Sequence, residues 1–362
     1  MSELRRFLHH FPNKPWNWGA LSANPNITMR DVELYPTRLW DWCQLSMNSS
    51  ITMRDVIDDP NKPWNWNYLS LNPNITMRDV NSHPDKPWGW ENLSRNPNIT
   101  MKDVDAYPDR LWNWYYLSDN PSITMKDVLT HLDKPWDWSC LSRNPGINMK
   151  DVIAHPDKPW NWCRLSMNPS IIINDVLAHP NNNWDWYWLS INSSITMANV
   201  LALDKPWNLY QLSLNPGITI KDIKDHPDIH WNWNYLSLNP NITIKDVKFY
   251  SDELWYWSWL SKNPNITIKD INSLPNKSWN WSWVSENPRV TVEDVINHPN
   301  RPWDWSQLSK NLFKRCPNVK LITIKKIKTV RDKHRIETQV KILHSRSELC
   351  TDLVSLIMIS FL

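Results

Sequence analysis

The chain has 362 residues, with 40 lysines and arginines, 37 aspartates and glutamates, 28 tryptophans, 28 prolines and only four glycines. So few glycines exclude a collagen-like chain, a glycine-rich linker and a glycine-rich phosphate-binding loop. The formal charge of +3 combines residues 1–310, with 29 basic and 33 acidic residues, and residues 311–362, with 11 and 4. We therefore expect a mildly acidic body and a basic tail.

The chain starts with MSELRRFLHHFP, residues 1–12, which contains no apolar stretch of signal-peptide length. We expect this segment to supply an N-terminal cap, because the end repeats of an array need a polar outer face. The five cysteines are too few and too scattered for a disulfide framework. These features predict an intracellular protein that is not secreted.

Tryptophan recurs every 24 residues across residues 13–311, apart from one deleted residue in the eighth repeat. In twelve of thirteen repeats a second tryptophan follows the lead tryptophan two positions later. A fixed period of this length is typical of repeat proteins, in which each unit packs mainly on its neighbours. The lead tryptophans are Trp16, Trp40, Trp64, Trp88, Trp112, Trp136, Trp160, Trp184, Trp207, Trp231, Trp255, Trp279 and Trp303.

Each repeat carries signals for two short helices. An Asp, Asn or Thr stands three positions before every lead tryptophan and predicts the N-cap of a first helix that begins directly after it. Serine and asparagine columns near the end of that helix predict helix-end and turn hydrogen bonds. The second helix is predicted by Ile-Thr-x-x-Asp-Val, in which the threonine and the aspartate resemble a capping box. Examples of the first cap are Asn13, Thr37, Asp85, Asp157 and Asn300.

These signals predict an all-α fold, a right-handed superhelical solenoid of about twelve to thirteen two-helix repeats of 24 residues. The main alternative is a β-solenoid, because Trp-x-Trp alternates and Ile-Thr-Ile is strand-like. The array is irregular near residues 199–209, where Asn199 replaces the aspartate and Leu209 replaces the second tryptophan. We expect a local change of twist there.

Two polar columns invite a catalytic or metal-binding interpretation. Histidines of adjacent repeats would stand about 10 Å apart, too far to share a zinc ion, and suit the C-terminal end of the second helix. Identical aspartates in every repeat differ from catalytic carboxylates, which need different environments. We therefore predict a protein that is not an enzyme, with no catalytic residue, metal site or cofactor. The histidines are His83, His131, His155, His179, His226 and His298.

The variable positions of the first helix are the candidate partner surface. Surplus aromatic residues gather at the two positions after Trp-x-Trp, and such residues are typical of contact hot spots. The residue between the recurring serine and asparagine of each repeat varies as well. We expect a non-enzymatic scaffold for an unknown protein partner, with filling of extra core as the alternative role of these aromatics. The candidates are Tyr115, Tyr116, Tyr187, Trp188, Trp259 and Trp283.

Residues 312–362 form a divergent basic tail without tryptophan. Its densest basic stretch, residues 320–333, supports an alternative function, association with nucleic acid or an anionic membrane. The final apolar run, residues 353–362, is too short to span a bilayer, so we expect no transmembrane segment.

The phrase KPWNWNYLSLNPNITMRDV, residues 62–80, resembles the Trp-rich tandem repeats of giant DNA viruses of the mimivirus type. The resemblance extends from about residue 11 to residue 311, and the tail departs from it. It implies a viral protein of host cytoplasm or virion, and it implies no activity, because those relatives have unknown functions.

Overall fold

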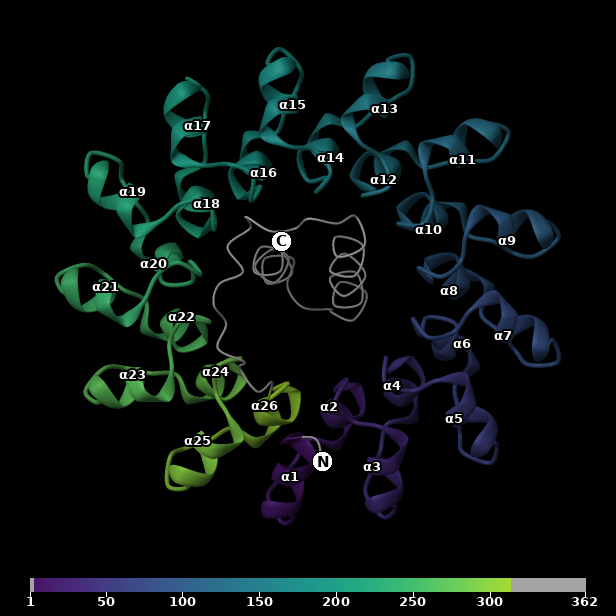
Figure 1. Ribbon diagram of the computed structural model, residues 1–362, viewed down its shortest axis with the longest axis horizontal. Helices are drawn as coiled ribbons and strands as arrows, with labels where there is room; N and C mark the ends of the chain where they lie inside the picture. The colour runs from purple at the N-terminus through teal and green to yellow at the C-terminus, as the bar shows by residue number, and fades with distance from the viewer. Residues whose placement is uncertain (1–2, 314–362) are drawn as a thin grey trace, which may run out of the picture. The chain divides into compact units, whose positions relative to one another are not determined.

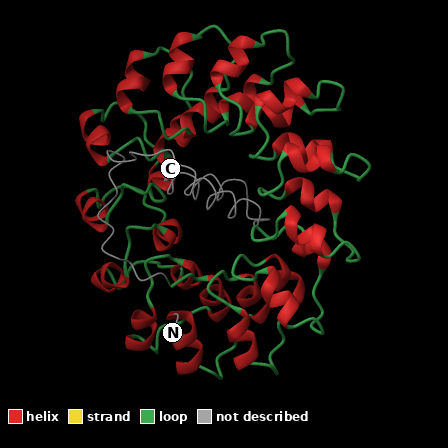
Figure 2. Ribbon diagram, turned by 45° about the vertical axis from the view of Figure 1, so that its right-hand side comes forward, coloured by secondary structure: helices red, strands yellow, loops and turns green. Residues whose placement is uncertain are grey.

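The computed structural model of the protein describes residues 3–313. These residues form 26 short α-helices, and no strand occurs among them (Figure 2). The predicted all-α array of two-helix repeats is confirmed, and the β-solenoid alternative is wrong for the described residues. Side-chain caps at both helix starts favour helices over the strand-like alternation of Trp-x-Trp.

The first helix of each repeat, called helix A, begins at the second tryptophan or its replacement. Helices A carry even numbers: α2 (Trp18–Ala23), α4 (Trp42–Met47), α6 (Trp66–Leu69), α8 (Trp90–Arg95), α10 (Trp114–Asp119), α12 (Trp138–Arg143), α14 (Trp162–Ser166), α16 (Trp186–Ile191), α18 (Leu209–Leu214), α20 (Trp233–Leu236), α22 (Trp257–Lys262), α24 (Trp281–Glu286) and α26 (Trp305–Lys310).

The second helix of each repeat, called helix B, follows the Ile-Thr pair or its replacement. Helices B carry odd numbers and are preceded by α1 (Glu3–His10): α3 (Met29–Leu34), α5 (Met53–Asp58), α7 (Met77–Ser82), α9 (Met101–Ala106), α11 (Met125–Thr130), α13 (Met149–Ala154), α15 (Ile173–Ala178), α17 (Met197–Ala202), α19 (Ile220–Asp225), α21 (Ile244–Phe249), α23 (Ile268–Ser273) and α25 (Val292–Asn297).

The predicted start of helix A is wrong. Asn13 and its equivalents other than Asp204 lie in a turn, which in the first repeat is closed by a bond from the Lys14 amide to the Phe11 carbonyl at 3.4 Å. Such turns commonly have proline at the second position and Asn or Asp at the third. The same residues also occur at helix caps, so the sequence pattern does not distinguish the two. The actual N-cap lies between the two tryptophans: the Asn17 side chain accepts the Ala20 amide at 2.9 Å.

The predicted capping box of helix B is confirmed. The Asp31 carboxylate accepts the Thr28 amide at 2.9 Å and the Thr28 hydroxyl at 2.8 Å. In the eighth repeat, Asn199 accepts from the Thr196 amide and hydroxyl at 2.9 and 2.7 Å. An amide oxygen thus serves this cap as a carboxylate does, so the start of helix B needs an acceptor and not a charge.

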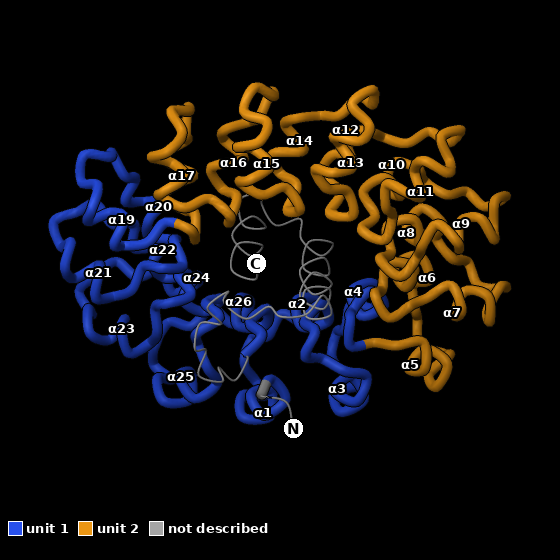
Figure 3. Tube along the Cα trace, turned by 45° about the horizontal axis from the view of Figure 1, so that its top comes forward, with its two compact units in different colours: residues 1–50, 218–362 blue, residues 51–217 orange. Residues whose placement is uncertain are grey.

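The chain divides into two compact units, residues 1–50 with 218–362 (unit 1) and residues 51–217 (unit 2) (Figure 3). In each unit the A helices lie side by side along one edge and the B helices along the other (Figure 1). In unit 2 the A helices from α8 to α18 pack on one another in chain order. In unit 1, α22, α24 and α26 are followed in the stack by α2 and α4.

Tryptophan rings fill the space between repeats. Ten of the thirteen lead tryptophans are buried, with 5–8% of their surface exposed. The Trp112 indole nitrogen donates to the Tyr107 carbonyl at 2.9 Å. The Trp90 ring of the preceding repeat meets the Trp112 ring edge-on, with centroids 5.0 Å apart. A lead tryptophan therefore joins its own turn to the neighbouring repeat, and both contacts stabilise the stack.

The serine and asparagine columns also connect repeats. The Ser94 hydroxyl donates to the Trp90 carbonyl at 2.8 Å and accepts the Asn113 amide at 2.9 Å. The Asn120 side chain donates to the Ser94 and Asn96 carbonyls, both at 3.0 Å. The predicted helix-end bonding is confirmed, and the structure adds that these side chains bridge successive repeats. They satisfy carbonyls that stacking removes from water.

Replacement of Asn144 with alanine is expected to lower the free energy of unfolding by about 2 to 4 kcal/mol, because buried partners lose their bonds. Its amide nitrogen donates to the Ser118 and Asn120 carbonyls at 2.9 Å, and its oxygen accepts the Gly146 amide at 2.7 Å. Urea denaturation followed by circular dichroism measures the change. The control is Asn183→Ala, at an exposed position outside the helices, and an equal loss in both variants would contradict the bridging role.

The deletion in the eighth repeat falls in the turn between α17 and Trp207. The Trp207 indole donates to the Leu203 carbonyl, four residues earlier, at 3.2 Å, whereas other lead tryptophans reach five residues back. The Asn208 amide still donates to the Ser190 hydroxyl at 2.9 Å. The turn therefore absorbs the deletion and the bond between repeats is kept. The expected change of twist at this place stays a prediction.

Candidate interaction surface

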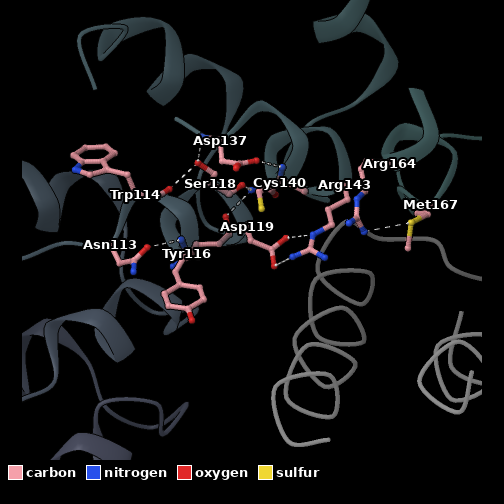
Figure 4. Close-up of polar contacts among 12 residues, drawn as sticks. Asn113, Trp114, Tyr116, Ser118, Asp119, Asp137, Cys140, Arg143, Arg164 and Met167 are labelled. Atoms are coloured by element: carbon pink, nitrogen blue, oxygen red, sulfur yellow. Dashed lines mark hydrogen bonds and ion pairs between the residues drawn. The ribbon is translucent and has the colours of Figure 1, made fainter. Parts of the chain in front are cut away.

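In each repeat, the third, fourth and seventh residues after the lead tryptophan lie on one side of helix A and of the turn that ends it. Residues three or four apart on a helix lie on the same side. We call the surface that they form in each unit the A face. In Figure 4, Tyr116 and the Asp119–Arg143 pair point to the same side of the helices, and Trp114 points away from it. The A face is thus separate from the lead and second tryptophans of each repeat.

All six predicted partner residues lie on the A face, and none of them is buried. Tyr115 is 51% exposed and Tyr187 is 39% exposed. Tyr116, Trp188, Trp259 and Trp283 are half-buried. Large aromatic side chains that retain exposure on a folded repeat are available to a partner.

Contacts between neighbouring repeats fix the orientation of several of these side chains in unit 2. The Gln211 amide donates to the Tyr187 hydroxyl at 2.8 Å. The Tyr116 ring lies 4.8 Å from the guanidinium of Arg95. Aromatic side chains held in this way lose less conformational entropy when they bind.

The Tyr115 hydroxyl of α10 and the Cys140 thiol of α12 influence each other's pKa. Burial raises the pKa of the Cys140 thiol above its ordinary value. The hydrogen bond to Cys140 raises the pKa of the Tyr115 hydroxyl. Both groups are therefore neutral at pH 7. A thiol with a raised pKa is a poor nucleophile, so this pair provides no activated group for covalent catalysis.

A column of charges runs along the A face at the seventh position. In unit 2, Arg95, Asp119 and Arg143 occupy this position in three successive repeats, and Arg143 binds Asp119 through two bonds of 2.8 Å (Figure 4). In unit 1, Lys262 bonds with Glu286 at 3.0 Å. Prediction from the sequence missed the alternation, although aligning this position across the repeats displays it.

Trp259 joins aromatic residues of two repeats in unit 1. Its ring centroid lies 5.3 Å from that of Tyr235 and 5.2 Å from that of Tyr256, both edge-on. In the next repeats, the Ser282 hydroxyl donates to Asp304 at 2.7 Å. Burial alone would raise the pKa of the Asp304 carboxyl, but the bond from Ser282 and backbone bonds hold the pKa below its ordinary value. The A face of unit 1 therefore includes the ring of Trp259 within an aromatic cluster, and its Ser282 bonds a charged carboxylate at the cap of α26.

The histidine column lies at the C-terminal end of helix B, as predicted. The Nδ1 atoms of His83, His131 and His298 lie 3.0, 2.8 and 2.8 Å from the carbonyl four residues earlier. Each ring thus satisfies a helix-end carbonyl. Within residues 3–313 no group of three His, Cys, Asp or Glu side chains is arranged to hold a metal ion.

No helix in the described part of the chain combines the length and apolar content needed to cross a membrane. The basic stretch at residues 320–333 and most of the predicted tail lie outside the described residues. No family model, curated protein or solved structure matches the chain.

Proposed function

We propose that the chain is a non-enzymatic scaffold that binds a protein partner through the A face. One observation carries the proposal: exposed aromatic and charged residues gather at the variable positions of a framework whose other positions repeat. The framework residues are used in burial and in bonds between repeats. Variation at the A face therefore changes what the surface recognises without changing the fold.

The chemistry of the A face is typical of protein recognition. Tyrosine, tryptophan and arginine are enriched among residues that dominate binding energies. Tyr115 and Tyr187 present both an aromatic ring and a hydroxyl, and Arg95 presents a guanidinium beside Tyr116. A surface of this composition suits a partner with apolar side chains and hydrogen-bonding groups.

Site-specific photo-crosslinking tests the proposal. A benzophenone amino acid is placed at Tyr115 or Tyr187 on the A face, or at Ile153 on helix B. Tyr115 and Ile153 are both 51% exposed. Crosslinking in cells is expected to give the same protein adducts from Tyr115 and Tyr187, and not from Ile153. Equal adducts from Ile153, or adducts with nucleic acid alone, would contradict a protein-binding A face.

Once the crosslinked partner is purified, the double substitution Tyr115→Ser with Tyr187→Ser is expected to weaken its binding by at least about 30-fold, the effect of a hot spot worth about 2 kcal/mol. Titration calorimetry measures the affinity. The helix-B variant Ile153→Ser is the control and should bind as the unmodified chain does. An unchanged affinity of the tyrosine variant would contradict the assignment of these residues.

The alternative function, association of the basic tail with nucleic acid or an anionic membrane, concerns residues outside the described part. Comparison of the full chain with residues 1–311 separates the two functions: tail-driven binding is lost on truncation and weakens steeply with salt. We further propose an intracellular location, kinship with the viral Trp-rich repeats, and a right-handed superhelical sense. An experimental structure of the full chain would test the handedness.

A further inference from the structure

The last repeat of the array is incomplete in sequence order. Its helix A is α26, and no helix B follows it before residue 313, where the described part ends. At the other end, α1 is the first described helix, and no helix A precedes it within residues 3–313. Unit 1 contains both of these ends.

Helix α1 lies in the place of the missing helix B. It packs beside α25, the helix B of the preceding repeat, while α26 packs beside α2. Phe7 of α1 is fully buried, and its ring centroid lies 5.8 Å from that of Trp305 and 4.9 Å from that of Phe313. The thirteenth repeat is therefore assembled from α26 and α1, which come from opposite ends of the sequence.

The junction reproduces the bonds between successive repeats. The Asn17 amide donates to the Ser309 hydroxyl at 3.0 Å, and the Asn24 side chain donates to the Ser309 and Asn311 carbonyls, both at 3.0 Å. The Trp16 and Trp305 rings meet edge-on with centroids 5.0 Å apart. These are the partners and distances seen where a covalent connection joins two repeats.

Two arginines of α1 pair with its neighbours on both sides. Arg5 binds the fully buried carboxylate of Asp31 on α3. Arg6 binds Glu293 on α25 at 2.6 Å, and both side chains are about half exposed. The pairs fix α1 between two B helices, in the register of a repeat.

We propose that α1 is a latch that completes the thirteenth repeat within one chain, and that the faces it covers bind a second copy of the chain when it is displaced. Among the contacts between repeats in residues 3–313, this junction is the place where the chain does not run directly from one repeat into the next. Its two sides are complementary copies of the ordinary repeat interface, so another chain presents the same bonding groups. Intramolecular closure is favoured because the ends belong to one molecule.

Crosslinking of the full chain tests the closed junction. Arg6→Cys and Glu293→Cys are introduced together after the five native cysteines are replaced with serine, and a short bismaleimide is added at low protein concentration. The expected product is an internally crosslinked single chain. Each single-cysteine chain is the control. A crosslinked dimer, or no product, would overturn the closed junction.

Displacement of α1 tests the second part of the proposal. Phe7→Asp places a charge in the buried position, whereas His9→Asp places the same residue at an exposed position of the same helix. Light scattering coupled to size exclusion is expected to give one chain for His9→Asp. The mass of Phe7→Asp is expected to at least double as its concentration is raised.

Circular dichroism distinguishes a folded chain that binds a second copy from a chain that has misfolded. Deletion of residues 1–11 provides a second displacement without a buried charge, and it should retain the helical signal and self-associate. Monomeric behaviour of both displaced chains would overturn the proposal. Loss of the helical signal in both would overturn it as well, because α1 would then be part of the folding core and not a separable latch.

Discussion

The substitution Trp184→Ala is expected to lower the free energy of unfolding by about 3 to 5 kcal/mol, the usual cost of deleting a large aromatic core side chain. Trp184 is a lead tryptophan that is 5% exposed. Its indole donates to the His179 carbonyl at 2.8 Å, and its ring meets Trp162 edge-on with centroids 4.9 Å apart. The substitution removes a bond within the repeat and a contact between repeats together.

The same repeat offers a matched control in Trp188→Ala. Trp188 lies on the A face, is half-buried, and contacts Tyr187 edge-on at 5.1 Å. Its replacement is expected to cost about 1 kcal/mol, since a partly exposed ring buries less apolar surface. Urea denaturation followed by circular dichroism gives both values. Similar losses in the two variants would show that the A-face aromatics fill core, and would remove the basis of the proposed binding surface.

The substitution Asp31→Asn is expected to destabilise the chain by about 2 kcal/mol, less than the about 3 to 5 kcal/mol of a fully buried ion pair. The Asp31 carboxylate is fully buried, and the side chain of its partner Arg5 retains 15% exposure. Asparagine preserves an oxygen for the Thr28 cap, as Asn199 does in the eighth repeat. The change therefore removes mainly the pair with Arg5.

The effect of Asp31→Asn should depend on pH. Burial alone would raise the pKa of the Asp31 carboxyl, but hydrogen bonds from Arg5 and Thr28 outweigh burial and hold the pKa below its ordinary value. A carboxyl whose pKa is lower in the folded chain stabilises it above the unfolded pKa, about 4, and loses this contribution as pH falls through the folded value. The unmodified chain and the variant should therefore converge in stability at low pH.

Asp270→Asn is the control for this prediction. Asp270 accepts from the Thr267 amide and hydroxyl at 2.9 and 2.6 Å, the bonds that Asp31 makes with Thr28. Ile244 occupies the position in the preceding helix B that corresponds to Arg5. The control should lose much less stability at pH 7. If both variants lost the same stability, the effect would come from the cap of helix B and not from the pair with Arg5 of α1.

The prediction from the sequence succeeded for helix B, because hydrogen bonds between residues close in the sequence decide where that helix starts. Thr28 and Asp31 are three residues apart, so their spacing alone identifies the start of helix B. The start of helix A was mispredicted, because turns and helix caps both use Asn and Asp, and Asn13 suits either. The A face could be identified from variation between repeats. Its charge alternation depends on aligning residues about 24 positions apart.

The sequence by itself determined the period, the two helices of each repeat and the chemistry of their caps, because these follow from side chains that bond within a few residues. Only the tertiary structure decided that Asn24 reaches Ser309 and that α1 completes the repeat of α26. Those contacts join residues nearly 300 positions apart, and they form only when stacked repeats bring the two ends of unit 1 together. The same identical bonding groups recur in every repeat, so the sequence pattern alone does not specify which copy follows which in the stack.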